Sequence, residues 1–322
     1  MKMGRAGVRV EFEPRFCANH VVDLTAGCSF GCIYCPFSDL SARRRGATRP
    51  IALALEGVER LPAPPSVFLS PASDPFAPQP AAGTHTLPAH LLPRGTNVGI
   101  LTKGIIPDAT LDLLAAHPNQ IEGVAIGVTS LDDHRNAVLE PGCPPAVARL
   151  GNLDRIAARG LIGALRIDPM FPDLDDRPES LEKLLAEASK RRANAVTATY
   201  VFAWGRYLRR LEREPLLAAS LPLLDEAAPM EGGTAFSVSL ARKMETYAYL
   251  AAQARARGLY FNTCGCKDLR VREAASFSTR CRNPFFFDPG TVTRSAGCPG
   301  PAPATPFVPP AGPPSQQQAL RG

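Results

Sequence analysis

Three cysteines lie close together near the N-terminus, at Cys28, Cys32 and Cys35. A loop with this spacing can turn three thiolates toward one point, and soft thiolate ligands select zinc, copper(I) or iron–sulfur clusters. A structural zinc site usually has four closed ligands, whereas the next cysteine in this chain is Cys143. Three thiolates on a four-iron cluster leave one iron without a protein ligand, and that iron can hold a substrate or cofactor. The spacing therefore allows a zinc site that takes a distant fourth ligand, or an iron–sulfur cluster with one open position.

Two neighbouring features favour the iron–sulfur interpretation. Tyr34 directly precedes the third cysteine, and the apolar run 20–24 before the motif predicts a short buried strand. With these features the pattern C-x3-C-x-aromatic-C resembles the signature of the radical S-adenosylmethionine (SAM) superfamily. The resemblance implies that the three cysteines hold a [4Fe-4S] cluster and that SAM chelates its fourth iron. Reductive cleavage of SAM would then yield a 5'-deoxyadenosyl radical that abstracts a hydrogen atom from a substrate. Tyr34 becomes a candidate cofactor contact.

Size and composition place few limits on the function. The chain has 322 residues, enough for one large domain or two, and its 45% apolar and 20% charged content is typical of a soluble globular protein. No run approaches the roughly 18 apolar residues of a membrane span. The basic N-terminus has no apolar core after it, so we expect no signal peptide. The nine cysteines are odd in number and clustered, which favours metal binding in a reducing cytoplasm over a disulfide framework.

Apolar β-type runs and amphipathic runs alternate along the first two thirds of the chain. We predict strands at 20–24, 66–70, 97–103, 121–129, 161–167 and 195–203, with helices at 51–61, 87–92, 107–116, 145–159 and 178–192. Six strands that alternate with helices predict parallel pairing. Helices on one side only would curl the sheet into an α/β fold, a partial (β/α)6 TIM-like barrel. The radical SAM resemblance implies the same architecture.

In barrels of this type the chemistry lies at the carboxyl ends of the strands. The cysteine loop, the turn 70–76, Lys103, Ser130 and Asp168 all follow predicted strands, so we expect them at one end of the barrel. The predicted parts are an N-terminal extension at 1–19, the barrel at 20–204, a cysteine-containing C-terminal extension at 205–298 and a disordered tail at 299–322. Within the C-terminal extension we predict a long helix at 237–257, ended by Gly258, and a strand at 259–263.

Four short motifs narrow the resemblance to one branch. S-D-P-F (73–76), L-T-K (101–103), L-E-P-G (139–142) and P-M-F-P (169–172) occur in the order seen in proteins related to spore photoproduct lyase. The resemblance implies that Lys103 pairs with the SAM carboxylate, and that Ser73 and Ser130 contact its amino-acid or ribose groups. Glu140 could bond the ribose, or cap the helix that begins near residue 145. The residues alone also allow a surface lysine at 103, a strand-end cap at Ser130 and an Asx-turn at Asp74.

One departure limits what the resemblance carries over. Spore photoproduct lyase uses a cysteine thiol after its cluster loop to return a hydrogen atom to the product radical. This chain has no cysteine between Cys35 and Cys143. Cys143 lies in the sequence G-C-P-P, which predicts a surface turn, with hydrogen donation as the alternative. We therefore do not expect the thymine-dimer lyase activity here.

A second cysteine group begins with Cys264 and Cys266 and continues at Cys281 and Cys298. Cys264 and Cys266 flank a single glycine, which allows an unusual turn and brings two thiolates close together. Three interpretations stay open: an auxiliary iron–sulfur cluster on Cys264, Cys266 and Cys281 with Cys298 or substrate as fourth ligand, a structural zinc site, or thiols without a metal. The radical SAM resemblance favours the first, because many such enzymes carry a C-terminal auxiliary cluster.

The predicted function is that of a cytoplasmic radical SAM enzyme acting on a small-molecule or nucleotide-like substrate in biosynthesis. A flavodoxin with its reductase, or a ferredoxin, is the expected electron donor, and no membrane partner is expected. The net charge of +6 allows nucleic acid but does not favour it, because nucleic-acid binding proteins usually show a strong basic stripe. The alternatives are a nucleic-acid repair lyase similar to spore photoproduct lyase, and a non-catalytic, zinc-stabilised nucleic-acid binding protein.

Overall fold

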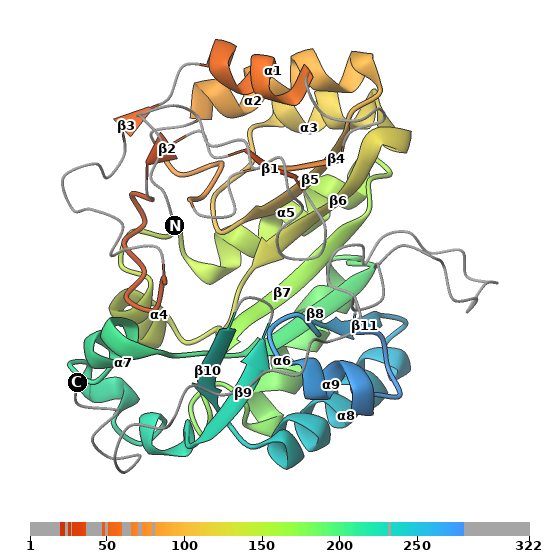
Figure 1. The fold of residues 1–322 in the computed structure, drawn as a ribbon. Helices are drawn as coiled ribbons and strands as arrows, with labels where there is room; N and C mark the ends of the chain where they lie inside the picture. Colours follow the sequence, from red (N-terminus) through yellow and green to blue (C-terminus); the bar gives the residue numbers. More distant parts are fainter. Residues whose placement is uncertain are drawn as a thin grey trace.

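The computed structural model describes residues 20–22, 25–26, 28–36, 47–48, 51–59, 66–69, 73–78, 81–230 and 233–279. Its main feature is a seven-stranded parallel sheet with the strand order β1-β4-β5-β6-β7-β8-β11 (Figure 1). The strands are β1 (His20–Val22), β4 (Ser66–Leu69), β5 (Asn97–Thr102), β6 (Ile121–Gly127), β7 (Gly163–Met170), β8 (Ala195–Tyr200) and β11 (Tyr260–Thr263). Two antiparallel pairs lie outside this sheet, β2 (Thr25–Ala26) with β3 (Ala47–Thr48), and β9 (Glu226–Met230) with β10 (Gly233–Ser237).

Helices alternate with the strands of the sheet, as the sequence predicts for a partial (β/α)6 barrel. They are α1 (Ile51–Glu59), α2 (Ala81–Leu91), α3 (Asp108–Ala115), α4 (Asp133–Leu139), α5 (Ala146–Ala158), α6 (Pro178–Lys190), α7 (Gly205–Leu211), α8 (Leu240–Ala256) and α9 (Leu269–Ala274). The α/β fold class and the parallel pairing of the six predicted strands are confirmed. No helix in the described part of the chain combines the length and the apolar character that crossing a membrane requires.

Side-chain alternation gives the sheet a helix-facing side. On β8, Val196, Ala198 and Tyr200 are fully buried in the main hydrophobic cluster. On α6, Leu181 and Leu184 belong to the same cluster, because apolar residues three and four positions apart form one stripe of the helix. This packing of apolar stripe against apolar strand face explains why the periodicities of the sequence located these elements correctly.

The other side of the sheet changes from small and apolar to polar along the strands. Ala125, Ala164 and Ala195 lie beside one another in register on β6, β7 and β8 and form a small separate cluster. Two residues further along, Thr197 pairs in register with Asn262 and donates a hydrogen bond to its Oδ1 atom at 2.7 Å. The polar layer therefore lies toward the carboxyl ends of the strands, where the sequence places the candidate site.

The C-terminal part of the chain differs most from the prediction. The predicted strand at 259–263 exists as β11, but it pairs with β8 and so extends the barrel sheet. The hairpin β9–β10 and helices α4, α7 and α9 have no predicted counterpart. The predicted helix 237–257 begins later, because Ser237 ends β10 and Ser239 caps α8 by accepting a hydrogen bond from the Arg242 N–H at 3.2 Å. Gly258 follows α8 with φ +70°, as predicted. The predicted segments 1–19 and 299–322 lie outside the described residues.

Candidate functional site

The three N-terminal cysteines lie on one short loop that follows β2. Cys28, Cys32 and Cys35 are each half-buried, and the Cys35 N–H donates to the Cys32 carbonyl at 3.1 Å, which forms a tight turn. Gly31 adopts φ +65°, a conformation that favours glycine. Burial, with a further contribution from the Asp74 carboxylate, raises the pKa of the Cys28 thiol to about 12. Binding of iron at this sulfur must therefore displace a proton.

The described side chains form no ready-made site for a single metal ion. Within the described residues, no three His, Cys, Asp or Glu side chains are placed to hold one metal ion together. An iron–sulfur cluster makes no such demand, because each cysteine thiolate binds a different iron.

The segment 139–143 holds the cysteine loop from one side. The Ile33 N–H donates to the Leu139 carbonyl at 3.0 Å, and the Gly142 N–H donates to the Phe30 carbonyl at 2.9 Å. A Cβ atom on Gly142 would lie only 2.6 Å from the Phe30 oxygen, so this close approach of two backbones requires glycine. The predicted L-E-P-G motif thus acts as a backbone clamp on the cysteine loop.

Helix α7, which sequence reasoning did not predict, contacts the cysteine loop through its own side chains. The Tyr207 hydroxyl donates to the Tyr34 carbonyl at 2.6 Å. Arg210 donates from Nε to the Ile33 carbonyl at 2.8 Å and from Nη2 to the Cys35 carbonyl. The loop carbonyls are thereby satisfied by a helix from the segment that follows the predicted barrel.

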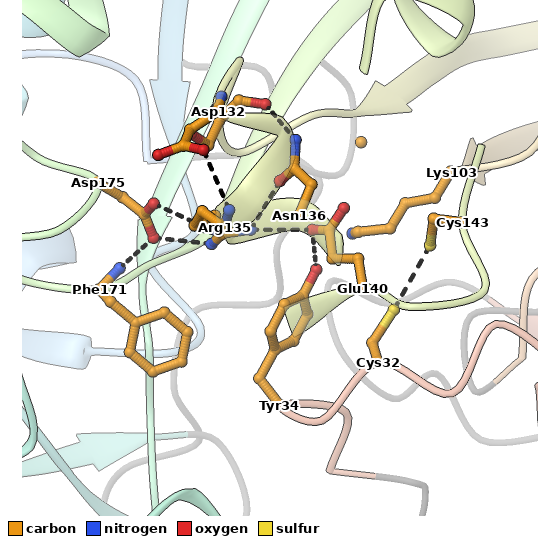
Figure 2. Close-up of polar contacts among 12 residues, drawn as sticks. Cys32, Tyr34, Lys103, Asp132, Arg135, Asn136, Glu140, Cys143, Phe171 and Asp175 are labelled. Carbon is orange, nitrogen blue, oxygen red and sulfur yellow. Dashed lines mark hydrogen bonds and ion pairs between the residues drawn. The ribbon is translucent and has the colours of Figure 1, made fainter. Parts of the chain in front are cut away.

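A buried network of charges lies beside the loop (Figure 2). The Tyr34 hydroxyl donates to Oε1 of Glu140, and Arg149 donates to Oε2 of the same carboxylate at 2.5 Å. Arg135 bonds Oε1 of Glu140 at 3.3 Å and makes a two-pronged contact with Asp175, at 3.0 and 2.8 Å. The side chains of Arg135, Asp175, Arg149 and Glu140 are all at most 1% exposed. Both oxygens of Glu140 are therefore engaged by the protein itself.

The carboxylate of Glu140 remains ionised despite its burial. Burial favours the neutral acid, but the positive charges of Lys103, Arg149 and Arg135 outweigh it and hold the pKa of Glu140 below its usual range. The alternative role predicted for Glu140, as a helix cap, is wrong, because α5 has no side-chain cap at its N-terminus.

Lys103 is not a surface lysine. It follows β5 and lies across the inner side of the sheet against Gly127, where a Cβ atom would come within 2.9 Å of the lysine Cγ. Its Nζ atom is 5.7 Å from the centroid of the Tyr34 ring and 3.5 Å from the Asp168 carbonyl. Burial would lower the pKa of Lys103, but the Glu140 carboxylate and the nearby thiols more than reverse this effect and raise it. The site thus contains a fixed cation close to the cysteine loop.

The turn after β4 brings Ser73 and Asp74 to the end of β5. Asp74 accepts hydrogen bonds from the Phe76 N–H at 2.9 Å, the Thr102 hydroxyl at 2.6 Å and the Lys103 N–H at 2.6 Å. The contact with Phe76 is the Asx-turn that the sequence allows. The hydroxyl oxygen of Ser73 is buried and has no hydrogen-bond partner. This unpaired group is available to a ligand.

Ser130 lies at the end of β6 and participates in local structure. Its hydroxyl accepts from the Asp132 N–H at 3.1 Å, and its carbonyl accepts from the Asn136 side chain at 2.8 Å. The strand-end cap is therefore present, and a ligand contact would add to it. The neighbouring Thr129 has a buried hydroxyl without a partner, a feature that the sequence motifs did not indicate.

Cys143 lies in the predicted turn and is half-buried, with its thiol in contact with a cysteine of the loop. Its Sγ atom is 3.6 Å from the Sγ atom of Cys32 (Figure 2). The contact between the two sulfurs lowers the pKa of Cys32 more than burial raises it. Sequence spacing could not reveal this contact, because the two cysteines are 111 residues apart.

Cys264 and Cys266 are buried and follow directly after β11. This strand belongs to the same sheet as the strands that carry the other site residues. Lys267 donates to both oxygens of Asp168 at 2.8 Å, and Arg166 donates to Oδ2 at 2.6 Å. These bonds connect the second cysteine group to the end of β7. Cys281 and Cys298 lie outside the described residues.

The structure also adds residues that the motifs omit. Arg135 and Arg149 come from α4 and α5, and Asp175 follows β7. Their local sequence does not indicate that they are buried, since isolated charged residues usually lie on the surface. Their burial would be recognisable only once the three elements are brought together.

The sequence was compared with protein families and with known proteins. A family model described as the Radical SAM superfamily matches residues 22–197. Uncharacterized protein Mb2609c of Mycobacterium bovis is 30% identical over 202 residues, and the match covers 57% of each chain. The present chain thus spans little more than half the length of the curated relatives that it matches.

Two solved structures share the fold. Spore photoproduct lyase complexed with dinucleoside spore photoproduct has a TM-score of 0.61 and 16% identity, with coverage of 80% of this chain and 79% of that chain. Streptococcus suis SuiB bound to precursor peptide SuiA has a TM-score of 0.52 and 13% identity, with coverage of 80% and 50%. The first likeness agrees with the branch indicated by the four short motifs. Because the family model covers more than half of the chain, including the cysteine loop and the strand ends around it, this chain belongs to the radical SAM superfamily of enzymes.

Proposed function

We propose that this chain is an enzyme in which Cys28, Cys32 and Cys35 hold a [4Fe-4S] cluster whose fourth iron binds SAM. When bound, the reduced cluster supplies the electron that cleaves SAM to an adenosyl radical, which takes a hydrogen atom from a substrate. The observation that carries the proposal is the clamped cysteine loop with the half-buried Lys103 beside it. The same strand ends carry unpaired buried hydroxyls.

The residues around the loop fit this pair of cofactors. The three thiols lie on one turn with an ordered backbone path, as a cluster site requires. The Ser73 and Thr129 hydroxyls are buried without partners, and such groups are costly unless a ligand satisfies them. The amino-acid and ribose groups of SAM offer suitable donors and acceptors. The proposed role of Ser73 follows from this match, whereas Ser130 would contact SAM in addition to its cap.

The chain's own residues would orient SAM. Lys103 keeps its positive charge and can pair with the SAM carboxylate as a point charge. Asp74 fixes the backbone of the strand end that carries this lysine, through its bond from the Lys103 N–H. Glu140 positions the aromatic ring of Tyr34 next to the cysteines. A ribose contact by Glu140 would require it to share an oxygen that already accepts from Tyr34 or an arginine.

For the substrate we favour a small-molecule or nucleotide-like compound in biosynthesis. The two structural neighbours bind a dinucleoside photoproduct and a precursor peptide, so this fold does not itself select a substrate class. Many basic side chains near the site already pair with carboxylates, among them Arg135, Arg149, Arg166, Lys267 and Arg270. Such pairing leaves fewer cations for a phosphate backbone. Reduction would come from a flavodoxin with its reductase, or from a ferredoxin.

A nucleic-acid repair lyase is the second candidate, favoured by the likeness to spore photoproduct lyase. It predicts DNA binding that weakens steeply with salt, because phosphate contacts release counterions. The small-molecule proposal predicts weak binding to DNA.

The Lys103→Met variant tests the orientation of SAM. We expect reconstituted wild type to release 5'-deoxyadenosine after dithionite reduction with SAM, and the variant to bind SAM about 10- to 100-fold more weakly, since a hydrogen bond to a charged group is lost. Anaerobic equilibrium dialysis with labelled SAM measures the affinity, and iron content should stay unchanged. Lys183→Met, on the exposed side of α6, is the matched control. Equal SAM affinity in both variants would remove Lys103 from the site.

An auxiliary cluster on Cys264, Cys266 and Cys281 is a further part of the proposal. The Thr263 N–H donates to the Ser278 carbonyl at 3.0 Å, and the Gly265 N–H donates to the Thr279 carbonyl at 2.9 Å. Residues 278 and 279 therefore lie alongside the segment that carries Cys264 and Cys266. Cys281 itself lies outside the described residues, so its place in the ligand set rests on the sequence.

Replacing both Cys264 and Cys266 by Ala tests this auxiliary cluster. Iron in the reconstituted protein should fall from about eight to about four per chain, because only the first cluster keeps its ligands. Iron and zinc are counted together by elemental analysis. Unchanged iron would contradict the assignment, and loss of zinc instead of iron would support the structural zinc site.

A further inference from the structure

Cys143 has no part in the ligand set proposed above, yet its thiol faces a cluster ligand. Its Sγ atom lies 3.6 Å from the Sγ atom of Cys32 (Figure 2). The two atoms of a disulfide are about 2.05 Å apart, so these sulfurs would have to approach by roughly 1.5 Å. Formation of a disulfide would therefore require the two side chains to move together by that distance.

The backbone keeps the two sulfurs near each other. Two backbone bonds join the segments that carry them: the Ile33 N–H, next to Cys32, donates to the Leu139 carbonyl, and the Gly142 N–H, next to Cys143, donates to the Phe30 carbonyl. Gly142 packs directly on the Phe30 backbone, where any side chain would clash. The backbone contacts that hold the segment 139–143 against the cysteine loop therefore also hold the two thiols near each other.

The pair lacks the partners of a single-ion metal site. Among the residues that the structure describes, no group of three His, Cys, Asp or Glu side chains is arranged around one ion. Two thiols in contact can be oxidised to a disulfide by thiol–disulfide exchange.

We propose that Cys32 and Cys143 form a reversible disulfide in the cluster-free protein, with a low-molecular-weight disulfide such as oxidised glutathione as the oxidant. One cysteine sulfur attacks the small disulfide, forms a mixed disulfide and releases one small thiol. The second cysteine then displaces the other small thiol. The protein loses two protons and two electrons, and the small disulfide gains them as two thiols.

The consequence concerns assembly of the cluster. A sulfur in a disulfide cannot bind iron, so the oxidised protein retains two of its three ligands and cannot take up the first cluster until it is reduced. This consequence rests on the proposed role of Cys32 as a ligand. Formation of the disulfide itself does not, and the two can be measured separately.

The experiment uses full-length protein freed of metal with a chelator under anaerobic conditions. One portion is treated with oxidised glutathione and another with dithiothreitol, and remaining thiols are alkylated before digestion with trypsin. Trypsin releases residues 16–43, which contain Cys32, and residues 136–149, which contain Cys143. Mass spectrometry of these peptides, with fragmentation to locate the link, gives the first readout. Uptake of iron and sulfide by unalkylated portions gives the second.

We expect a cross-linked pair of these two peptides in the oxidised wild type, and its absence in Cys143→Ala and Cys32→Ala. Iron uptake by the oxidised wild type should be at least about tenfold slower than by the reduced protein, because a ligand must be present as the thiolate. Dithiothreitol should restore it. Cys17→Ala, which removes another cysteine of the peptide 16–43, should cross-link like wild type.

Two results would overturn the proposal: Cys32 found linked only to glutathione or to a cysteine of its own loop, or the cross-linked protein taking up the first cluster as fast as the reduced protein. If the reduced protein takes up no iron but the cross-link forms, the disulfide stands and the cluster assignment fails.

Discussion

Cys32→Ala should abolish both the first cluster and the cleavage of SAM. Iron bound at this loop should be lost, and 5'-deoxyadenosine should fall to background, at least about 1000-fold below wild type, because a cluster with two of three protein ligands is not retained. The measurement is anaerobic reconstitution with iron and sulfide, followed by iron counting and by chromatography of the nucleoside after dithionite reduction with SAM.

A control from the same loop separates ligand loss from damage to the loop. Ser29 is exposed between two of the cysteines, so Ser29→Ala should keep iron and nucleoside production within about twofold of wild type, as surface changes usually do. If Cys32→Ala kept its iron and its nucleoside production, the motif would not be the cluster site. Retained zinc without iron in wild type would favour the zinc-stabilised binding protein instead.

Arg135→Met should destabilise the protein strongly, although this residue touches none of the cysteines. The substitution conserves much of the side-chain volume but leaves the Asp175 and Glu140 carboxylates buried without their shared cation. Removal of one partner from a buried ion pair typically costs about 3–5 kcal/mol. For a chain of this size that loss corresponds to a melting temperature on the order of 10 °C lower. Thermal unfolding of the metal-free protein, followed by circular dichroism, measures it.

An exposed arginine provides the comparison. Arg155 pairs with Asp108, whose side chain is 67% exposed, so Arg155→Met should change the melting temperature by no more than about 1 °C. Arg135→Met should also release iron faster to a chelator, because Glu140 would no longer be held between Arg135 and Tyr34. Equal melting temperatures for the two variants would show that the buried network does not stabilise the fold.

The double variant Arg135→Met with Asp175→Asn checks the cause of the effect. If the cost comes from the unpaired Asp175 carboxylate, the second substitution should restore part of the stability, since it removes the buried charge. A double variant whose losses simply add would indicate that Arg135 contributes by packing alone.

Local patterns in the sequence were sufficient for the barrel and for the cysteine loop. The strands have apolar faces and the helices have apolar stripes, so periodicity located β4 to β8 and most of the helices between them. The spacing of Cys28, Cys32 and Cys35 allowed a zinc site or an iron–sulfur cluster, and the resemblance to the radical SAM superfamily favoured the cluster. Lys103 and Ser73 could be placed at one edge of the sheet because each follows a recognisable strand, and parallel strands end at the same edge.

Tertiary structure alone decided how that loop is supported. The buried network joins three separate parts of the chain, which contribute Arg135, Arg149 and Asp175. The neighbouring residues in the sequence do not indicate that a charged side chain is buried, because its partners come from elsewhere in the chain. The pairing of β11 with β8 depends on sheet packing between segments about 65 residues apart, which no periodicity encodes. The contact between Cys143 and Cys32 depends on a glycine that lets two backbones touch. The sequence therefore determined which chemistry the loop can perform, and folding determined which residues hold it and which second thiol it meets, because those contacts join residues far apart in the chain.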